Sequence, residues 1–277
     1  MSETNLSNIP DTRKLFRELS GDLAHFLRTL RLADWNRKTI SAKWTVRDIA
    51  AHLLDGSMRR VSVHRDNFAM PPYDTERFPV LFNYLDHLNS TWVEAARRLS
   101  PQVLLEMIER FDSQYASLMD AADLEGQAVF PVDWMGEATS TNRADFARDY
   151  TEKWYHQQQI RHAFDSHAIE SPRYLRPVYD IFALAVPVAL AELNSTSGDT
   201  ATLIISGQSG GTWSFVYDGK AWKSTSEVSA NSIELEARYA WRFLTNRAYK
   251  AEKRASVEKR GKPDICEALL NTLAMMA

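Results

Sequence analysis

The sequence of 277 residues predicts a mainly α-helical protein, a four-helix bundle followed by a small α+β domain. Up to about residue 170, apolar residues recur at intervals of three and four, as they do on amphipathic helices. Beyond that point, short β-type runs alternate with turn sequences such as "QSGG" and "DG". The change of pattern predicts two domains, residues 1–172 and residues 173–277.

The helices of the first domain follow from their periodicity and end signals. The first covers residues 11–32, with leucines on one stripe. The second begins after Thr45, where Asp48 three residues later completes a capping box. A third helical region covers residues 80–122 and breaks near a Ser-Pro pair, because proline does not fit a helix interior. A fourth helix contains the segment "YTEKWYHQQQIRHAF".

The second domain combines strands and helices. The runs "TLIISG", "TWSFVY" and "KAWKST" predict a three-stranded meander, because hairpin-forming residues separate them. Two helices are expected after it, over residues 232–245 and 264–275. The run "IFALAVPVAL" at 181–190 is too short to span a bilayer and is interpreted as a buried helix.

Charge and cysteine content exclude several classes of function. Lys and Arg total 33 against 36 for Asp and Glu, so the net charge of −3 gives no positive field, and we expect no nucleic-acid partner. No apolar run reaches about 18 residues, so no membrane partner is expected. The lone Cys266 and the polar N-terminal segment predict a reducing, cytoplasmic location. Nothing in the sequence sets the oligomeric state.

The fourth helix carries a pair of candidate metal ligands. Glu152 and His156 are four residues apart, so they lie about 40° apart on the same helical face. Their oxygen and nitrogen donors suit zinc and neighbouring divalent metals. An ordinary surface interaction between the two side chains is the alternative.

His52, in "DIAAHLLDG", is the best candidate for a third ligand. It flanks the apolar stripe of the second helix, and ligands on facing helices of a bundle converge in the core. Three protein ligands would leave metal positions open for water or substrate. A partly buried histidine that bonds to a neighbouring helix is the competing interpretation. A phosphate-binding loop and a nucleophile elbow are both absent from the sequence.

The segments "KWTVRDIAAHLLDG" and "YTEKWYHQQQIRHAF" together resemble the metal-binding domain of mycothiol-dependent maleylpyruvate isomerases, within the DinB/YfiT-like bundle superfamily. The resemblance covers most of residues 10–170 and implies a DinB-like bundle with a divalent metal at His52, Glu152 and His156. The implied metal is zinc, with nickel and iron(II) as alternatives. The implied partners are a low-molecular-weight thiol such as mycothiol and a small electrophilic substrate.

The C-terminal region is similar to the SCP2-like second domain of the same isomerases. In that domain an arginine after a glycine at a helix end is directed to the active-site cleft. By position, Arg247 matches this catalytic arginine, although Asn246 replaces the glycine. The implied function is a thiol-dependent cis-trans isomerase or a thiol S-transferase. The alternative is a non-catalytic metal- or small-molecule-binding module in stress response or regulation.

Overall fold

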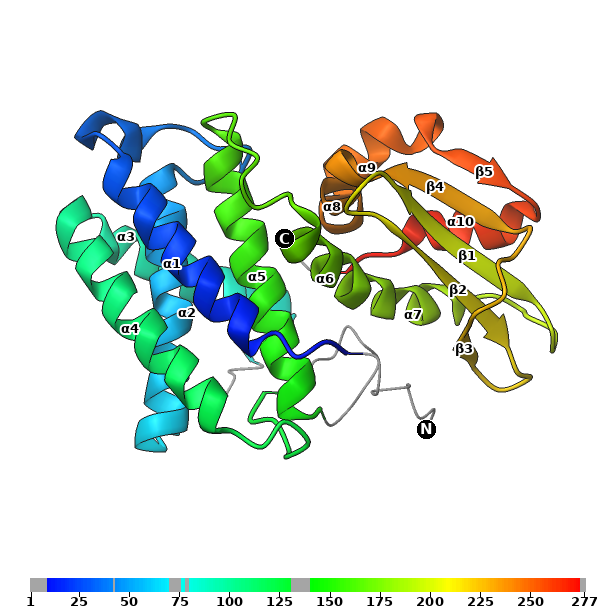
Figure 1. Cartoon of the computed structure of the whole chain (residues 1–277), viewed down its shortest axis with the longest axis horizontal. Coiled ribbons are helices and arrows are strands. Elements are labelled where there is room, and N and C mark those ends of the chain that lie inside the picture. Colours follow the sequence, from blue (N-terminus) through cyan, green and yellow to red (C-terminus); the bar gives the residue numbers. More distant parts are fainter. Residues whose placement is uncertain (1–8, 42, 70–75, 78–79, 131–139, 275–277) are drawn as a thin grey trace. The chain divides into compact units, whose positions relative to one another are not determined.

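The computed structural model describes residues 9–41, 43–69, 76–77, 80–130 and 140–274 of the chain (Figure 1). Two compact units make up the protein. One contains Thr12–Asp123 and Glu152–Ile169, and the other contains Leu124–Thr151, Glu170–Ala277 and the N-terminal segment. The division passes through one helix, whereas the domains predicted from sequence are continuous. The proposed domain boundary at residues 172 and 173 stays a prediction.

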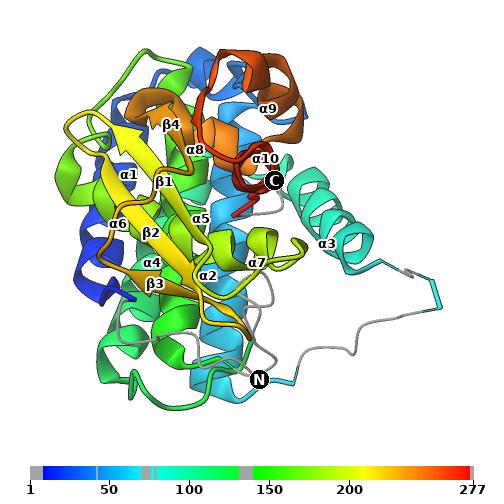
Figure 2. The same cartoon turned by 90° about the vertical axis from the view of Figure 1, so that its right-hand side faces the viewer.

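The first unit is a bundle of long helices, in agreement with the predicted helical periodicity. Helices α2 and α4 pack against each other, α1 packs on α4, and α3 packs on α2. In Figures 1 and 2, α5 runs beside α1 and α2. The bounds are α1 (Arg13–Thr29), α2 (Val46–Asp66), α3 (Leu81–Ala96), α4 (Pro101–Ala121) and α5 (Asn142–His162).

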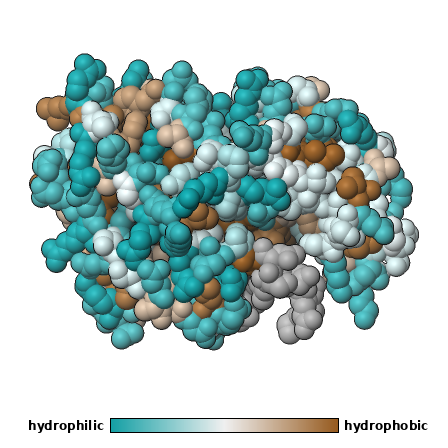
Figure 3. Space-filling model, in the orientation of Figure 1, coloured by the Kyte–Doolittle hydropathy of each residue, from teal (hydrophilic) through white to brown (hydrophobic). Residues whose placement is uncertain are grey.

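The ends of the bundle helices follow from local sequence. Thr45 caps α2 by accepting from the Asp48 backbone, and the Asp48 carboxylate accepts from the Thr45 N–H at 3.1 Å, which confirms the predicted capping box. Ser100 caps α4, and Pro101 is its first residue, as expected for the Ser-Pro pair. Hydrophilic side chains cover most of the bundle face seen in Figure 3.

The second unit contains a five-stranded sheet with the strand order β3-β2-β1-β4-β5. Strands β1 and β4 are parallel, and the other neighbours are antiparallel. The predicted meander is present as β1, β2 and β3, and Gly207 and Gly210 close the turn between its first two strands through a hydrogen bond of 3.0 Å. The strand bounds are β1 (Thr200–Ser206), β2 (Gly211–Tyr217), β3 (Trp222–Thr225), β4 (Ser232–Glu236) and β5 (Glu258–Arg260).

Helices cover one face of this sheet. Helix α10 contacts β1, β4 and β5, and Figure 1 shows it behind the strands. The apolar residues Ala201, Leu203 and Ile205 of β1 are buried on one face, and Thr202 on the other face is buried as well. The helices of this unit are α6 (Pro172–Phe182), α7 (Val186–Leu190), α8 (Ala237–Thr245), α9 (Arg247–Lys253) and α10 (Pro263–Asn271).

The prediction of one helix over residues 232–245 is wrong in its first part. Residues 232–236 form β4, and α8 begins only at Ala237. The reason is the period-two pattern, in which Ile233 and Leu235 are buried while Glu236 is exposed. Cys266 is buried. Of the helices that the structure describes, none is both long enough and apolar enough to cross a lipid bilayer.

Candidate metal centre

Helix α2 brings His52 into the interior of the bundle. The capping box fixes the start of the helix at Val46, so His52 lies in its second turn among buried residues. The apolar side chains of Ile49 and Leu53 belong to the bundle core, and His52 itself is only 6% exposed. A buried histidine of this kind needs a partner for its ring nitrogens.

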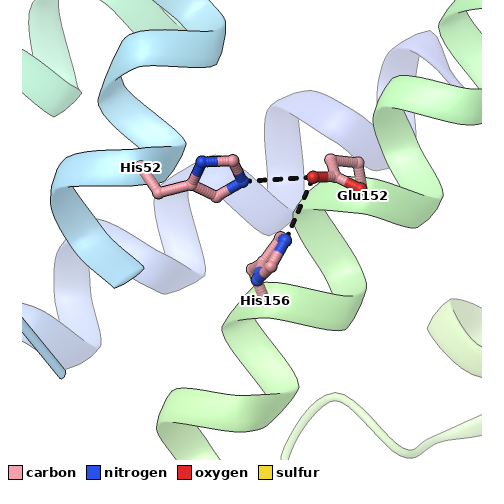
Figure 4. Close-up of side chains that lie close together, drawn as sticks. All are labelled: His52, Glu152 and His156. Atoms are coloured by element: carbon pink, nitrogen blue, oxygen red, sulfur yellow. Dashed lines mark hydrogen bonds and ion pairs between the residues drawn. The ribbon is translucent and has the colours of Figure 1, made fainter. Parts of the chain in front are cut away.

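Helix α5 supplies the other two candidate ligands from successive turns. One carboxylate oxygen, Oε1 of Glu152, lies 3.2 Å from Nε2 of His52 and 3.0 Å from Nε2 of His156 (Figure 4). One donor atom from each of the three residues lies within 4.8 Å of the others. The structure therefore brings together the three residues selected from the sequence. Within the described part of the chain, no other such group of histidine, cysteine or acidic side chains is found.

The hydrogen-bond partners of the His156 ring indicate which of its two nitrogens is available to bind a metal. Its Nδ1 donates a hydrogen bond to Oε1 of Gln159 at 2.9 Å, and both side chains are buried. In a neutral imidazole only one nitrogen carries a proton, so Nε2 of His156 presents a lone pair to the carboxylate of Glu152. Two acceptors at 3.0 Å repel each other unless a proton or a cation lies between them. Gln159 thus orients His156 as a metal ligand would be oriented.

The separations between donors fit a metal ion. Two ligand atoms each about 2.1 Å from an ion, at tetrahedral or octahedral angles, lie about 2.9–3.4 Å from each other. The distances from Glu152 Oε1 to the two imidazole nitrogens, 3.0 and 3.2 Å, fall in that range. Nδ1 of His52 is buried without a hydrogen-bond partner among the described atoms. No donor at Nδ1 therefore forces the ring proton onto Nε2, and Nε2 can serve as the ligand atom.

Electrostatics keep the candidate ligands in their binding forms. Burial opposes ionisation of Glu152, but the attraction and hydrogen bonds of the two adjacent imidazoles, when their Nε2 atoms carry a proton, outweigh it and hold the pKa of this carboxyl well below its usual range. Burial, reinforced by the nearby His156, lowers the pKa of His52. At neutral pH Glu152 is therefore ionised and His52 is neutral, which are the states that bind metals. The Glu152 side chain is 41% exposed, so the centre opens to solvent on that side.

The sequence also matches a described family. Residues 16–161 match the family described as "Mycothiol maleylpyruvate isomerase N-terminal domain". This match spans more than half of the chain. The chain belongs to this family.

Comparison with solved structures extends the likeness beyond the matched residues. The crystal structures of the mycothiol-dependent maleylpyruvate isomerase and of a histidine-to-alanine mutant of that enzyme both match with a TM-score of 0.55. Each alignment has 10% identity and covers 87% of this chain and 90% of the other. At that identity the likeness shows a shared fold. None of the curated proteins matches the sequence significantly.

Two residues beside the centre of this family member were missed by the sequence interpretation. The Trp44 ring lies 4.9 Å from the His52 ring and 6.0 Å from the His156 ring, measured between centroids. Gln159 follows His156 by three residues, and this spacing alone would have placed it on the same helical face. For Trp44, which precedes the first turn of α2, no spacing rule predicts the contact.

Arg247 lies at a different kind of helix end from the one expected. Helix α8 stops at Thr245, and Oδ1 of Asn246 caps the following helix by accepting from the Tyr249 N–H at 3.0 Å. Arg247 is consequently the first residue of α9, not the last of a preceding helix. Its side chain lies outside the described part of the structure, so its catalytic role stays a prediction for this family member.

Proposed function

We propose that the chain binds a divalent metal, most simply zinc, through His52, Glu152 and His156. The observation that carries this proposal is the convergence of two imidazole Nε2 atoms on one carboxylate oxygen at 3.2 and 3.0 Å. The hydrogen bond from His156 to Gln159 supports it, because that bond leaves Nε2 free to bind. Nickel and iron(II) accept the same donors and are the alternatives to zinc.

The proposed activity is a thiol-dependent reaction of the kind named for the family. When bound, a metal with three protein ligands acts as a Lewis acid and lowers the pKa of a thiol that occupies an open coordination position. In a maleylpyruvate isomerase-like reaction, the thiolate sulfur would form a bond to one carbon of a cis double bond, and the electron pair would move onto the conjugated carbonyl. Rotation about the resulting single bond and loss of the thiolate would restore the double bond as trans.

The protein residues have distinct roles in this proposal. The exposed side of the centre is the side formed by Glu152, and a thiol and a small electrophile would approach from that side. The Trp44 indole lies against the His52 ring and limits access of water to it. Gln159 keeps the proton of His156 on Nδ1. Arg247 is proposed to hold the carboxylate groups of an anionic substrate, since a guanidinium binds carboxylates in a bidentate manner.

Metal content is the decisive first measurement. The untreated protein should contain about one metal ion per chain by elemental analysis, and His52→Ala should lose most of it. His162→Ala is a matched control, because His162 is exposed and lies on the same helix as His156. A metal-free wild type, purified without chelators, would contradict the proposal.

Turnover then separates an enzyme from a binding module. The metal-loaded protein should convert maleylpyruvate in the presence of mycothiol, followed by ultraviolet absorbance, and His52→Ala should be inactive. A protein that binds metal stoichiometrically but turns over no combination of thiols and electrophiles would be a non-catalytic module. That outcome would retain the metal centre and reject the isomerase or transferase activity.

A further inference from the structure

A buried polar cluster connects the two helices that carry the candidate ligands. Asp112 on α4 accepts a hydrogen bond from Ser57 at Oδ1 and an ion-paired hydrogen bond from Lys153 at Oδ2, both at 2.5 Å. All three residues are 3–4% exposed. Ser57 lies on α2 five residues after His52, and Lys153 is the residue after Glu152 on α5. One carboxylate therefore links α2 to α5 through α4.

The same lysine also contacts helix α1 of the bundle. Its ammonium nitrogen lies 4.9 Å from the centre of the Phe16 ring on α1, within the range of a cation–π interaction. The cluster of Ser57, Asp112 and Lys153 therefore meets α1, α2, α4 and α5 at one place.

Stability alone is a poor reason for such a cluster. Burying an ion pair removes two charges from water, and apolar side chains of similar volume commonly stabilise a core as well or better. What the pair adds is geometric selectivity, since its two charges remain compensated only at one arrangement of the helices. A shift of α5 would leave the Lys153 ammonium without its partner in the core.

The candidate metal centre is sensitive to such a shift. Side-chain tips lie about 5–6 Å from a helix axis, so a rotation of about 2° moves them by about 0.2 Å. Metal–ligand distances tolerate changes of about 0.2 Å. Because Lys153 and Glu152 are adjacent on one rigid helix, holding the lysine in place also holds Glu152 and His156 against His52.

We propose that Ser57, Asp112 and Lys153 form a positioning cluster that sets the rotation of α5 relative to α2 and thereby the metal affinity of the centre. These residues act through His52, Glu152 and His156 and do not touch the metal or the substrate. The inference rests on the proposed metal centre for its first measurement. The same cluster should set the position of α5 relative to α2 in the metal-free protein as well.

The test compares the double variant Asp112→Leu/Lys153→Met with the wild type. Removing both charges together should leave the thermal midpoint close to that of the wild type or higher, because no buried charge is left unpaired. The dissociation constant for Zn²⁺, measured by competition with a chromophoric chelator on the fully folded protein, should nevertheless rise by about tenfold. A stable double variant with a dissociation constant within twofold of the wild type would overturn the inference.

Two further variants separate positioning from general loss of stability. Lys153→Met alone should raise the zinc dissociation constant and also destabilise the protein, because Asp112 is left buried without its counter-charge. Met119→Ala is the control: Met119 is fully buried on α4, two turns from Asp112, and its truncation leaves a cavity but keeps the cluster. This control should lose stability and keep the zinc affinity of the wild type. An equal loss of affinity in the control would contradict a positioning role.

A second measurement remains decisive if the wild type binds no metal and the proposed function fails. The His52 and His156 rings lie 4.5 Å apart between centroids. Magnetisation transfer between their ring protons should therefore be observed by NMR in the metal-free wild type, with His52→Ala used for assignment. Because this transfer falls with the sixth power of distance, a displacement of about 0.2 Å should weaken the signal by about a quarter in the double variant. An unchanged signal would overturn the positioning role, whatever the metal result.

Discussion

Replacing Gln159 with leucine should weaken metal binding without touching a ligand. In the structure Nδ1 of His156 donates to Oε1 of Gln159 at 2.9 Å, and the two side chains are 8% and 5% exposed. Leucine has nearly the same volume but accepts no hydrogen bond. In the metal-bound protein the Nδ1 proton of His156 would then be buried without a partner.

The size of the effect follows from the difference between the free and bound states. A buried donor without a partner costs about 1–3 kcal/mol. The metal-free variant lowers this cost, because the proton can move to Nε2, where Oε1 of Glu152 lies 3.0 Å away and accepts it, and only an imidazole lone pair is left without a partner at Nδ1. In the metal-bound form the proton cannot move to Nε2, because the lone pair of Nε2 then binds the metal. Only the difference between the two states appears in binding, and the dissociation constant should rise at least severalfold and at most about 150-fold.

Competition with a chromophoric chelator measures this change directly, with Co²⁺ as a second probe whose absorption reports its coordination. Gln159→Glu provides the contrasting variant, because a carboxylate also accepts the Nδ1 proton and should preserve tight binding. Gln158→Leu is the matched control, since Gln158 is 1% exposed and forms no hydrogen bond to His156. Equal dissociation constants for Gln159→Leu and the wild type, or an equal loss in Gln158→Leu, would refute the role assigned to the amide.

Four other changes test separate parts of the structure. Burial opposes ionisation of Asp48, but hydrogen bonds from Arg97 and from the helix cap outweigh it and lower its pKa. Its contribution, about 2 kcal/mol after discounting for the half-exposed Arg97, should therefore be present above about pH 4 and be lost as the pH falls through the lower folded pKa. Urea unfolding curves of the wild type and Asp48→Asn should differ at pH 7 and converge once the pH lies below the folded pKa of Asp48; a constant difference would contradict this. Gly56→Ala should raise the free energy of unfolding by about 0.5–1 kcal/mol, because an added Cβ meets no atom within 4 Å, and lower stability would reveal a hidden clash. Burial raises the pKa of the Cys266 thiol, so reaction with a disulfide reagent should be slow in the folded protein and fast in urea. Arg247→Ala should raise the KM for an anionic substrate while leaving metal content unchanged, and unaltered kinetics would remove Arg247 from the proposed site.

The candidate ligands were predictable because helical spacing and local signals specify them. The four-residue interval places Glu152 and His156 on one face, and the capping box of Thr45 and Asp48 fixes the start of the helix that carries His52. The meeting of α2 and α5 was supplied by the family resemblance, since periodicity does not say which helices of a bundle face each other. The structure provides that contact through Glu152.

The strand over residues 232–236 shows a signal that was present in the sequence but outweighed by the pattern that follows it. Apolar Ile233 and Leu235 alternate with Glu234 and Glu236, which is the period of a strand. The helix at Ala237–Thr245 follows without a turn sequence between them. With no glycine or proline at the junction, the helical pattern was extended too far toward the N-terminus.

The interior of α5 could not be predicted from hydrophobic patterning. Its buried positions include a run of polar and charged residues, among them Lys153, Gln157, Gln158, Gln159 and Arg161. A helix with polar side chains on every face would ordinarily be assigned to solvent. Lys153 and Arg161 have partners in distant parts of the chain, Asp112 and the backbone carbonyl of Asp22, and no local pattern records those pairings.

This polar interior gives α5 a property that an apolar helix would lack. Apolar side chains tolerate small rotations and slides, because dispersion and burial depend weakly on direction, whereas hydrogen bonds and ion pairs lose strength when atoms leave their alignment. Lys153 fixes α5 against Asp112, and Gln159 fixes the ring of His156, so the helix and its ligand are each held by a directional contact. The proposed centre, built from a flexible carboxylate and two imidazoles, would gain its preorganisation from these contacts. The polar residues whose burial hydrophobic patterning does not predict are therefore the ones that would make the geometry of the candidate ligands specific.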